Sequence, residues 1–430
     1  MKYIYLCLFL FAVLIFLIHY AISGQAVYGD GIGYYSHLHS WIIDRDWDYT
    51  NEYKHIYDHE HNNFDTGVES PVVQIVSTSE SGKAENFYGT GVAVLLLPFY
   101  LLAHLISMAL NLFGANLTTN GYGDWYQIFS GLGAIFYTVC GIYFLEKIIY
   151  FETRNSRISV VSAMTIFLST NLLYYGSFDV INSHFASFFL ATVFFYLFFN
   201  DKGSNNHLLL GLMAGLMTIT RIQDSVIVIL WVTEILRSHN LKLKVVSKFL
   251  IGFLFGIMPL AIHWSMVFDN PLRQTYIRGL FETFQARQVP SILGSLFNPV
   301  TGLFTRIPLL AVLYIFFLYL VVKKEAKNLL YPFSFLVMQF CIITVQGGWV
   351  AAAYGGRMYL SSMVFFGLLL GKLLLRISVK SLARVYLIVS LFIVINFISI
   401  SLFILRDKGA EGGEHGTEQR TLQRIQKFLN

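Results

Sequence analysis

The chain has 430 residues, of which 56% are hydrophobic and only 13% are charged, and its formal net charge is +5. A soluble domain is usually about a quarter charged, so this deficit and the repeated apolar runs of about 18 or more residues predict an all-α polytopic membrane protein. The basic residues lie in short loops between apolar runs, which is a topology signal and does not indicate nucleic-acid binding. The cysteines at 7, 140 and 341 lie inside apolar runs without metal-ligand spacing, which argues against a disulfide framework and a zinc site.

The first apolar run, from about Tyr3 to Ile22, follows Lys2 and predicts a helix that leaves the cytoplasm. It is longer than the apolar region of a typical signal peptide, so we expect it to be an uncleaved anchor. Residues 23–87 are polar, with acids, histidines and aromatic residues but few lysines. This segment is predicted to be a first outer loop that carries short juxtamembrane helices at the interface.

The next apolar run, from Tyr88 to about Phe113, has no positive charge on either flank. If it crossed the membrane, the following helix would place Lys147, Arg154 and Arg157 outside, against the positive-inside rule. It is therefore predicted to be a re-entrant or juxtamembrane hairpin that is buried against protein.

The remaining apolar runs alternate so that nearly every basic loop is cytoplasmic; the loop with Arg273, Arg278 and Arg287 is predicted to lie outside. They cover about residues 124–149, 158–175, 185–199, 208–236, 246–267, 308–322, 329–345, 358–375 and 385–405. The run 208–236 is interrupted at Thr220 to Asp224, which predicts two half-helices that meet at an intramembrane polar cluster. Residues 1–405 are thus predicted to form one domain of about 10–12 transmembrane helices, followed by a charged outer tail, residues 406–430.

Asp30 follows the first helix directly and lies between Gly29 and Gly31. The glycines would let the backbone bend and approach a ligand closely. A partly desolvated carboxylate at a membrane rim is placed to act as a general base, although the same position also suits a solvated acid at a helix end.

The predicted topology also brings arginines to the outer face. Arg306 and Arg357 lie at outer helix ends, against the positive-inside bias, which favours binding of a lipid phosphate over simple snorkelling. Arg221 is expected either to bind phosphate or to form a structural pair with Asp224. His184 is interpreted as a hydrogen-bonded interface histidine.

The stretch from Tyr28 to Tyr35, with the sequence YGDGIGYY, is followed by DRDWD at residues 44–48. Together they resemble the first outer loop of bacterial GT-C glycosyltransferases related to the protein O-mannosyltransferase and aminoarabinose-transferase families. Four later segments resemble the same family in the same order: residues 87–99, 211–224, 298–308 and 347–357. The resemblance implies a GT-C-like bundle in the bacterial plasma membrane. It also implies a polyprenyl-phosphate-linked sugar as donor and a glycan, lipid or protein acceptor on the extracytoplasmic side.

The resemblance assigns the role of base to Asp30 and extends donor-phosphate binding to Arg357, Arg221 and Arg306. Gly31 stands where a second acid often follows in the family, so a second carboxylate would have to come from elsewhere. The candidates are Asp46, Asp48 and Asp179.

The sequence has no glycine-rich nucleotide-binding motif, which disfavours a nucleotide-sugar donor. The one cofactor left open is a divalent cation, which Asp46 and Asp48 could hold through carboxylate oxygens. Three other functions remain open. A lipid-linked-sugar flippase or other transporter should show midplane polar residues, which Arg221 and Asp224 fit. An O-antigen polymerase or ligase would place its chemistry in a late loop, and a non-catalytic membrane assembly partner would retain only the scaffold.

Overall fold

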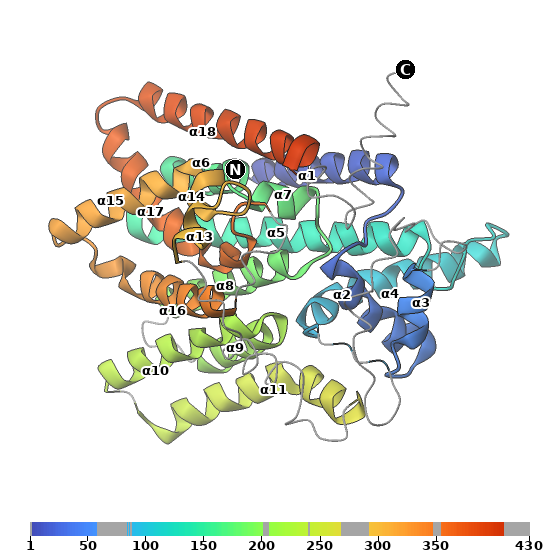
Figure 1. The fold of residues 1–430 in the computed structure, drawn as a ribbon. Coiled ribbons are helices and arrows are strands. Elements are labelled where there is room, and N and C mark those ends of the chain that lie inside the picture. The colour runs from blue at the N-terminus through green and yellow to red at the C-terminus, as the bar shows by residue number, and fades with distance from the viewer. Residues whose placement is uncertain are drawn as a thin grey trace, which may run out of the picture.

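The computed structural model describes residues 2–57, 84, 86, 88–200, 206–239, 241–267, 292–346 and 354–407. Every element formed within these ranges is a helix (Figure 1). Eight helices in the described ranges are long and apolar enough to cross a membrane, and three shorter ones are also apolar. The chain is therefore an all-helical, multi-pass membrane protein.

In chain order, the helices are α1 (Lys2–Ser23), α2 (Asp30–His39), η1 (Ser40–Asp44), α3 (Thr50–Tyr57), α4 (Gly91–Leu112), α5 (Asp124–Thr153), α6 (Ser156–Leu168), α7 (Leu172–Ser177), α8 (Ser183–Asn200), α9 (His207–Thr220), η3 (Ile222–Val226), α10 (Ile227–Arg237), α11 (Leu243–Val267), α13 (Ile292–Phe297), α14 (Leu303–Arg306), α15 (Pro308–Val322), η5 (Lys327–Leu329), α16 (Leu330–Gln346), η7 (Arg357–Ser362), α17 (Met363–Ser378), α18 (Leu382–Leu402) and η8 (Phe403–Asp407).

The 30-residue helix α5 lies at the centre and contacts α1, α4, α6, α7, α8 and α17. Its glycines allow these neighbours to pack closely. A Cβ atom on Gly141 would lie 2.6 Å from the Phe188 ring, and one on Gly131 would overlap the Phe16 ring. Small residues at such crossings are typical of helix packing in membranes, where close van der Waals contact drives association.

The predicted break after α9 is confirmed. The helix ends at Thr220, Arg221 is extended with φ −150° and ψ 122°, and the chain continues through η3 into α10. The two half-helices α9 and α10 have 14 and 11 residues, and each is shorter than the roughly 20 residues needed to cross a bilayer. The break therefore places a polar, non-helical residue inside the bundle.

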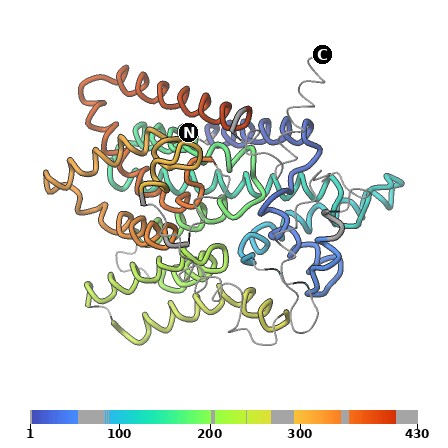
Figure 2. Tube along the Cα trace, viewed as in Figure 1, coloured from blue at the N-terminus to red at the C-terminus, as the bar shows by residue number. Residues whose placement is uncertain are grey.

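The hairpin predicted for residues 88–113 is wrong. A single continuous helix, α4, runs from Gly91 to Leu112, and Pro98 lies inside it without ending it. Its first turn packs against the α9 break, where a Cβ on Gly91 would overlap Thr220. The predicted burial against protein holds for the first part of α4, while Leu105, Met108 and Leu112 in its second half are exposed. The helix lies with α2 at one end of the bundle (Figures 1 and 2).

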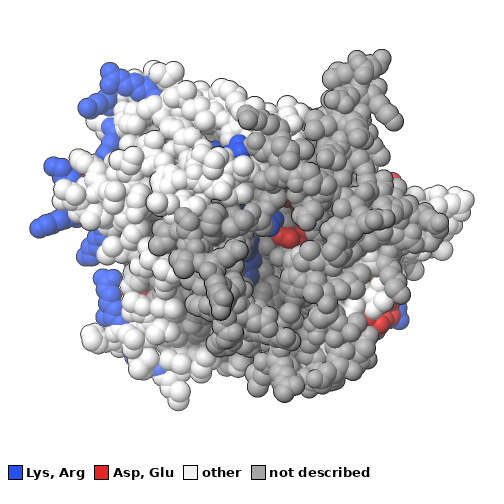
Figure 3. All heavy atoms as spheres, viewed as in Figure 1, with Lys and Arg blue, Asp and Glu red and all other residues white. Residues whose placement is uncertain are grey.

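Lysine and arginine side chains gather at the other end, the left edge of Figure 3. The turns between α10 and α11, between α15 and α16, and between α17 and α18 lie at this end in Figure 1. The two ends of the molecule thus differ in charge, with α2 and α3 far from the basic turns. Much of the predicted outer loop (residues 58–83), the Gly/Trp segment 347–353 and most of the charged tail (408–430) lie outside the described residues.

Candidate active site

Asp30 is the first residue of α2, and the glycines around it have two different roles. Gly29 has φ 53° and ψ −132°, a conformation that glycine tolerates best, so it turns the chain into the helix. A Cβ on Gly31 would overlap the Ile181 carbonyl oxygen, and one on Gly33 would overlap the Tyr88 ring. Gly31 and Gly33 therefore serve close packing of α2 against protein, whereas the sequence had suggested close approach to a ligand.

The Asp30 carboxylate has two protein partners. Its Oδ2 lies 3.1 Å from Nη1 of Arg357, and its Oδ1 accepts a hydrogen bond of 3.2 Å from the Tyr88 hydroxyl. The Asp30 side chain is 39% exposed and the Arg357 side chain 18% exposed. Arg357 opens η7 directly after Gly355 and Gly356, which both have positive φ. Asp30 is thus an ion-paired acid that solvent and a ligand can still reach.

Arg221 is buried at the break after α9, and its Nη1 donates to Nδ1 of His184 at 2.6 Å. Because a guanidinium can only donate, Nδ1 of His184 is the acceptor and the ring proton is on Nε2. Nη2 of Arg221 also contacts the sulfur of Met358, the neighbour of Arg357. These contacts bring the α9 break, α8 and η7 together around one guanidinium.

Arg221 and Asp224 interact electrostatically but do not form a direct ion pair. The Asp224 carboxylate is buried and instead accepts hydrogen bonds from Ser187, Ser361 and Gln339. Among the described residues, no carboxylate lies within ion-pair distance of Arg221. A buried cation without a direct counter-ion is costly unless an anion joins it.

The two arginines belong to one site. The buried Tyr34 interacts electrostatically with Asp30, Arg221 and Arg357, and so lies among all three. Two buried donors at this site, Nε2 of His184 and Nε of Arg357, have no hydrogen-bond partner within the described part of the chain. The guanidinium of Arg221 is also held by the side-chain oxygen of Gln223, which accepts from its Nη2 at 2.9 Å and from its Nε at 2.7 Å. Two guanidinium groups, one of them with an unpartnered Nε–H, suit an anion such as a phosphate.

The other predicted residues are placed differently. Arg306 donates from Nε to the Val300 carbonyl oxygen at 3.0 Å, and its guanidinium lies over the Phe403 ring at 6.0 Å. These described contacts are not with Asp30 or Arg357. Asp179 is the candidate second carboxylate that interacts electrostatically with Arg357.

Asp46 and Asp48 organise the turn between η1 and α3. Oδ1 of Asp46 accepts from the Ser40 hydroxyl at 3.1 Å and from the Asp48 backbone N–H at 3.2 Å. Oδ1 of Asp48 accepts from the Thr50 backbone N–H at 3.1 Å and from its hydroxyl at 2.7 Å, as a helix N-cap does. The structure gives both acids local partners and does not bring them to Asp30.

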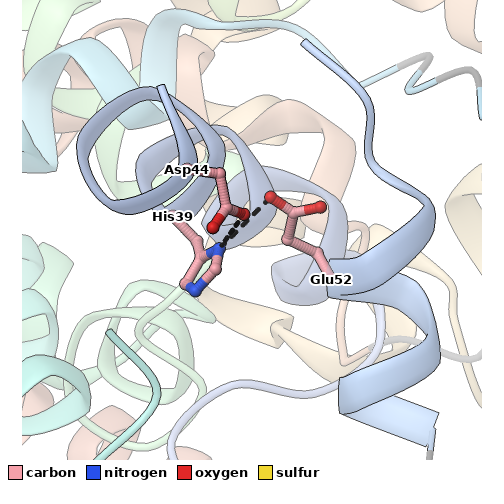
Figure 4. Close-up of side chains that lie close together, drawn as sticks. All are labelled: His39, Asp44 and Glu52. Carbon is pink, nitrogen blue, oxygen red and sulfur yellow. Dashed lines mark hydrogen bonds and ion pairs between the residues drawn. The ribbon is translucent and has the colours of Figure 1, made fainter. Parts of the chain in front are cut away.

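A second polar cluster, which the sequence analysis missed, lies at the other end of α2 (Figure 4). It consists of His39, Asp44 and Glu52, whose nearest ligand atoms all lie within 4.8 Å of one another. Nδ1 of His39 is 3.0 Å from Oδ2 of Asp44 and 3.2 Å from Oε1 of Glu52. Burial raises the pKa of Glu52 to about 7, although its hydrogen bond with His39 acts in the opposite direction.

Sequence reasoning singled out Asp30, Arg221 and Arg357 but missed Tyr88 and the way His184 orients Arg221. No local signal could have found these two contacts, because each joins segments that are far apart in the chain. Comparisons with protein-family models, with curated proteins and with solved structures gave no match to this chain.

Proposed function

We propose that the chain is a GT-C-like glycosyltransferase that moves a sugar from a polyprenyl-phosphate donor to an extracytoplasmic acceptor. The observation that carries this proposal is the reachable Asp30–Arg357 pair beside the buried cation Arg221. A glycosyl transfer from a lipid phosphate needs these two parts, a base for the acceptor and cationic donors for the leaving phosphate.

The orientation in the membrane follows from charge. Lys and Arg gather at the end of the bundle opposite to α2, and short basic loops stay in the cytoplasm. This supports an extracytoplasmic position for Asp30, in a bacterial plasma membrane as the resemblance implies.

In the proposed reaction, the oxygen of an acceptor hydroxyl attacks the anomeric carbon of the donor sugar. The bond between that carbon and the phosphate oxygen breaks, and its electron pair leaves with the phosphate. The hydroxyl proton passes to Asp30, and the configuration at the anomeric carbon inverts. Arg357 and Arg221 stabilise the charge that develops on the phosphate, as preorganised donors do.

The ion pair suggests how donor binding prepares the base. Before the donor binds, one oxygen of Asp30 shares the guanidinium of Arg357. A phosphate that takes over this guanidinium bidentately would release that oxygen to face the acceptor hydroxyl. The hydrogen bond from Tyr88 would then hold the carboxylate in place through its other oxygen.

The proposal is tested by mass spectrometry of lipid-linked glycans and envelope polymers. The samples come from a deletion strain complemented with the wild-type chain, with Asp30→Asn, or with the control Asp124→Asn. Asp124 is an acid at the start of α5 that accepts a 2.6 Å hydrogen bond from Tyr20, which asparagine can also accept. We expect the wild type and the control to restore the product, and Asp30→Asn to lower transfer by about 100-fold or more, the usual contribution of a general base.

Transfer at the wild-type rate by Asp30→Asn would contradict the proposed role of Asp30. The buried break at Arg221 and Asp224 is the one feature that also suits a transporter. An assay with the purified protein in lipid vesicles distinguishes a transferase from a transporter. Movement of a lipid-linked sugar across the bilayer without formation of any glycosylated product would replace the enzyme proposal with a flippase.

A further inference from the structure

We propose that His39, Asp44 and Glu52 form a binding site for a divalent transition-metal ion of the Zn²⁺ type, and that this ion has a structural role. The three residues come from successive elements, the last residue of α2, the last residue of η1, and α3. This inference concerns a different part of the molecule from the Asp30 site and does not depend on the proposed transferase activity.

The spacing of the ligand atoms fits a small ion. Zn²⁺ bonds to imidazole nitrogen and carboxylate oxygen at about 2.0–2.2 Å, so the ligand atoms of a tetrahedral site lie about 3.3 Å apart. Nδ1 of His39 lies 3.0 Å and 3.2 Å from the carboxylate oxygens of Asp44 and Glu52. Figure 4 shows both carboxylates facing the same ring nitrogen.

The imidazole of His39 is oriented by contacts that are typical of metal-bound histidines. Its Nε2 lies 2.9 Å from the Asn120 carbonyl oxygen, so Nε2 carries a proton and donates it. Nδ1 can then offer its lone pair to the cluster, and a backbone carbonyl on the other ring nitrogen is the common second contact of metal-bound histidines. The Tyr122 ring stacks on the imidazole at 4.0 Å and fixes its plane.

Glu52 provides an independent observation. Its side chain is fully buried, and its Oε2 has no hydrogen-bond partner among the residues that the structure describes. A buried carboxylate that has an unsatisfied oxygen and faces a second carboxylate is stabilised only if a positive charge lies close to it. A bidentate contact of Glu52 with a dication would supply that charge and satisfy the second oxygen.

The ligand set also selects the kind of ion. One imidazole nitrogen with carboxylate oxygens suits Zn²⁺ and its transition-metal neighbours, whereas Mg²⁺ and Ca²⁺ prefer sites built only from oxygen. Three protein ligands leave a fourth position for water. The Asp44 side chain is 25% exposed, which gives the ion a path from solvent.

The position of the cluster points to a structural role. Asp30 and His39 are the two ends of α2, and a helical rise of 1.5 Å per residue puts them about 14 Å apart. An ion at His39 therefore does not reach the groups around Asp30. It would join η1 and α3 to α2 and, through Asn120 and Tyr122, to the segment before α5.

The test uses the full-length protein, purified in detergent and freed of metal with a chelator. We expect about one equivalent of Zn²⁺ to bind per chain and to raise the melting temperature by about 5 °C or more. Glu52→Gln, which keeps the shape of the side chain but removes its charge, should weaken Zn²⁺ binding by about 100-fold or more. Added Co²⁺ should give tetrahedral d–d absorption bands that are lost in His39→Ala, which reports on the imidazole ligand.

The matched control is Asp46→Asn, the same change from acid to amide in the same segment. Asparagine can still accept the hydrogen bonds from Ser40 and Asp48, so Zn²⁺ affinity should stay within about 3-fold of wild type if Asp46 is not a ligand. Two results would overturn the proposal. One is failure of the metal-free protein to bind Zn²⁺ or Co²⁺, which would mean that the three side chains form a hydrogen-bonded cluster without an ion. The other is equal loss of binding in Asp46→Asn, which would place the ion elsewhere in the turn.

Discussion

The pairing of Asp30 with Arg357 assigns separable roles to the two side chains. If Arg357 holds the donor phosphate, Arg357→Lys keeps the positive charge but loses the bidentate fork. The loss of one charged hydrogen bond, worth about 1.5–3 kcal/mol, should raise the KM for the lipid-linked donor by about 10- to 100-fold. Steady-state kinetics in vesicles should show this rise, whereas Asp30→Asn should act mainly on kcat.

The control for this measurement is Arg384→Lys. Arg384 is an exposed residue at the start of α18, next to the basic turn and away from Asp30. Exchange of arginine for lysine at this position should leave KM and kcat near their wild-type values. A fall in kcat with an unchanged KM in Arg357→Lys would show that Arg357 does not hold the ground-state donor.

The packing around Asp30 also determines which residues fit at position 31. A Cβ at this position would overlap the Ile181 carbonyl oxygen, so the packing of α2 leaves no room for a second acid directly after Asp30. Another carboxylate that acts on the site is Asp179, whose charge interacts with Arg357 from the segment just before Ile181. A motif with a single acid is therefore consistent with the packing of this chain.

The helices α9 and α11 pack backbone to backbone, because glycines lie where they cross. Cβ atoms on Gly211 and Gly252 would overlap backbone oxygens of the opposite helix. Gly252→Leu should therefore force the two helices apart and destabilise the fold by about 2 kcal/mol or more. Thermal unfolding in detergent measures the effect, and Ala261→Leu on the exposed face of α11 is the matched control. Equal melting temperatures for the two variants would contradict a close crossing.

Local sequence signals were sufficient to predict the bounds of one helix and the break in another. The run 308–322 was predicted with the bounds that α15 has, and the break after Thr220 was found because polar residues interrupt an apolar run. The hairpin at α4 failed because the positive-inside rule concerns crossing and carries no information on local shape. Pro98 lies within the first half of α4, and the helix continues on both sides of it.

Within the molecule as a whole, contacts between distant segments are the part that the sequence could not provide. Asp30 was recognisable from its local context, but its partners Tyr88 and Arg357 come from other regions of the chain. The cluster of His39, Asp44 and Glu52 has no familiar ligand spacing, and the sequence drew attention to the closely spaced Asp46 and Asp48 instead. Only the folding of η1 and α3 back onto α2 brings the three side chains of the cluster together.

The orientation of the whole molecule can be tested by cysteine labelling. The chain's own cysteines are first replaced, and Thr119→Cys and Ser238→Cys are then made separately. Thr119 is exposed in the loop between α4 and α5, and Ser238 is exposed at the end of α10 near the basic turns. If α1 leads outward and α4 stays on the outer side, as the proposed orientation requires, a membrane-impermeant maleimide should label the cysteine at position 119 in intact spheroplasts.

The cysteine at position 238 should react only after permeabilisation, since its loop is basic and therefore cytoplasmic. Labelling of 238 but not 119 in intact spheroplasts would mean that the bundle is inverted, and Asp30 would then face the cytoplasm. Protection of both positions would mean that α4 crosses the membrane, because the loop before α5 would then lie on the same side as the basic turns. Inversion would remove the argument for an extracytoplasmic reaction. Crossing by α4 would leave Asp30 outside, because Asp30 precedes α4 in the chain. The expected pattern would put Asp30 and Arg357 on the side that the proposed reaction needs.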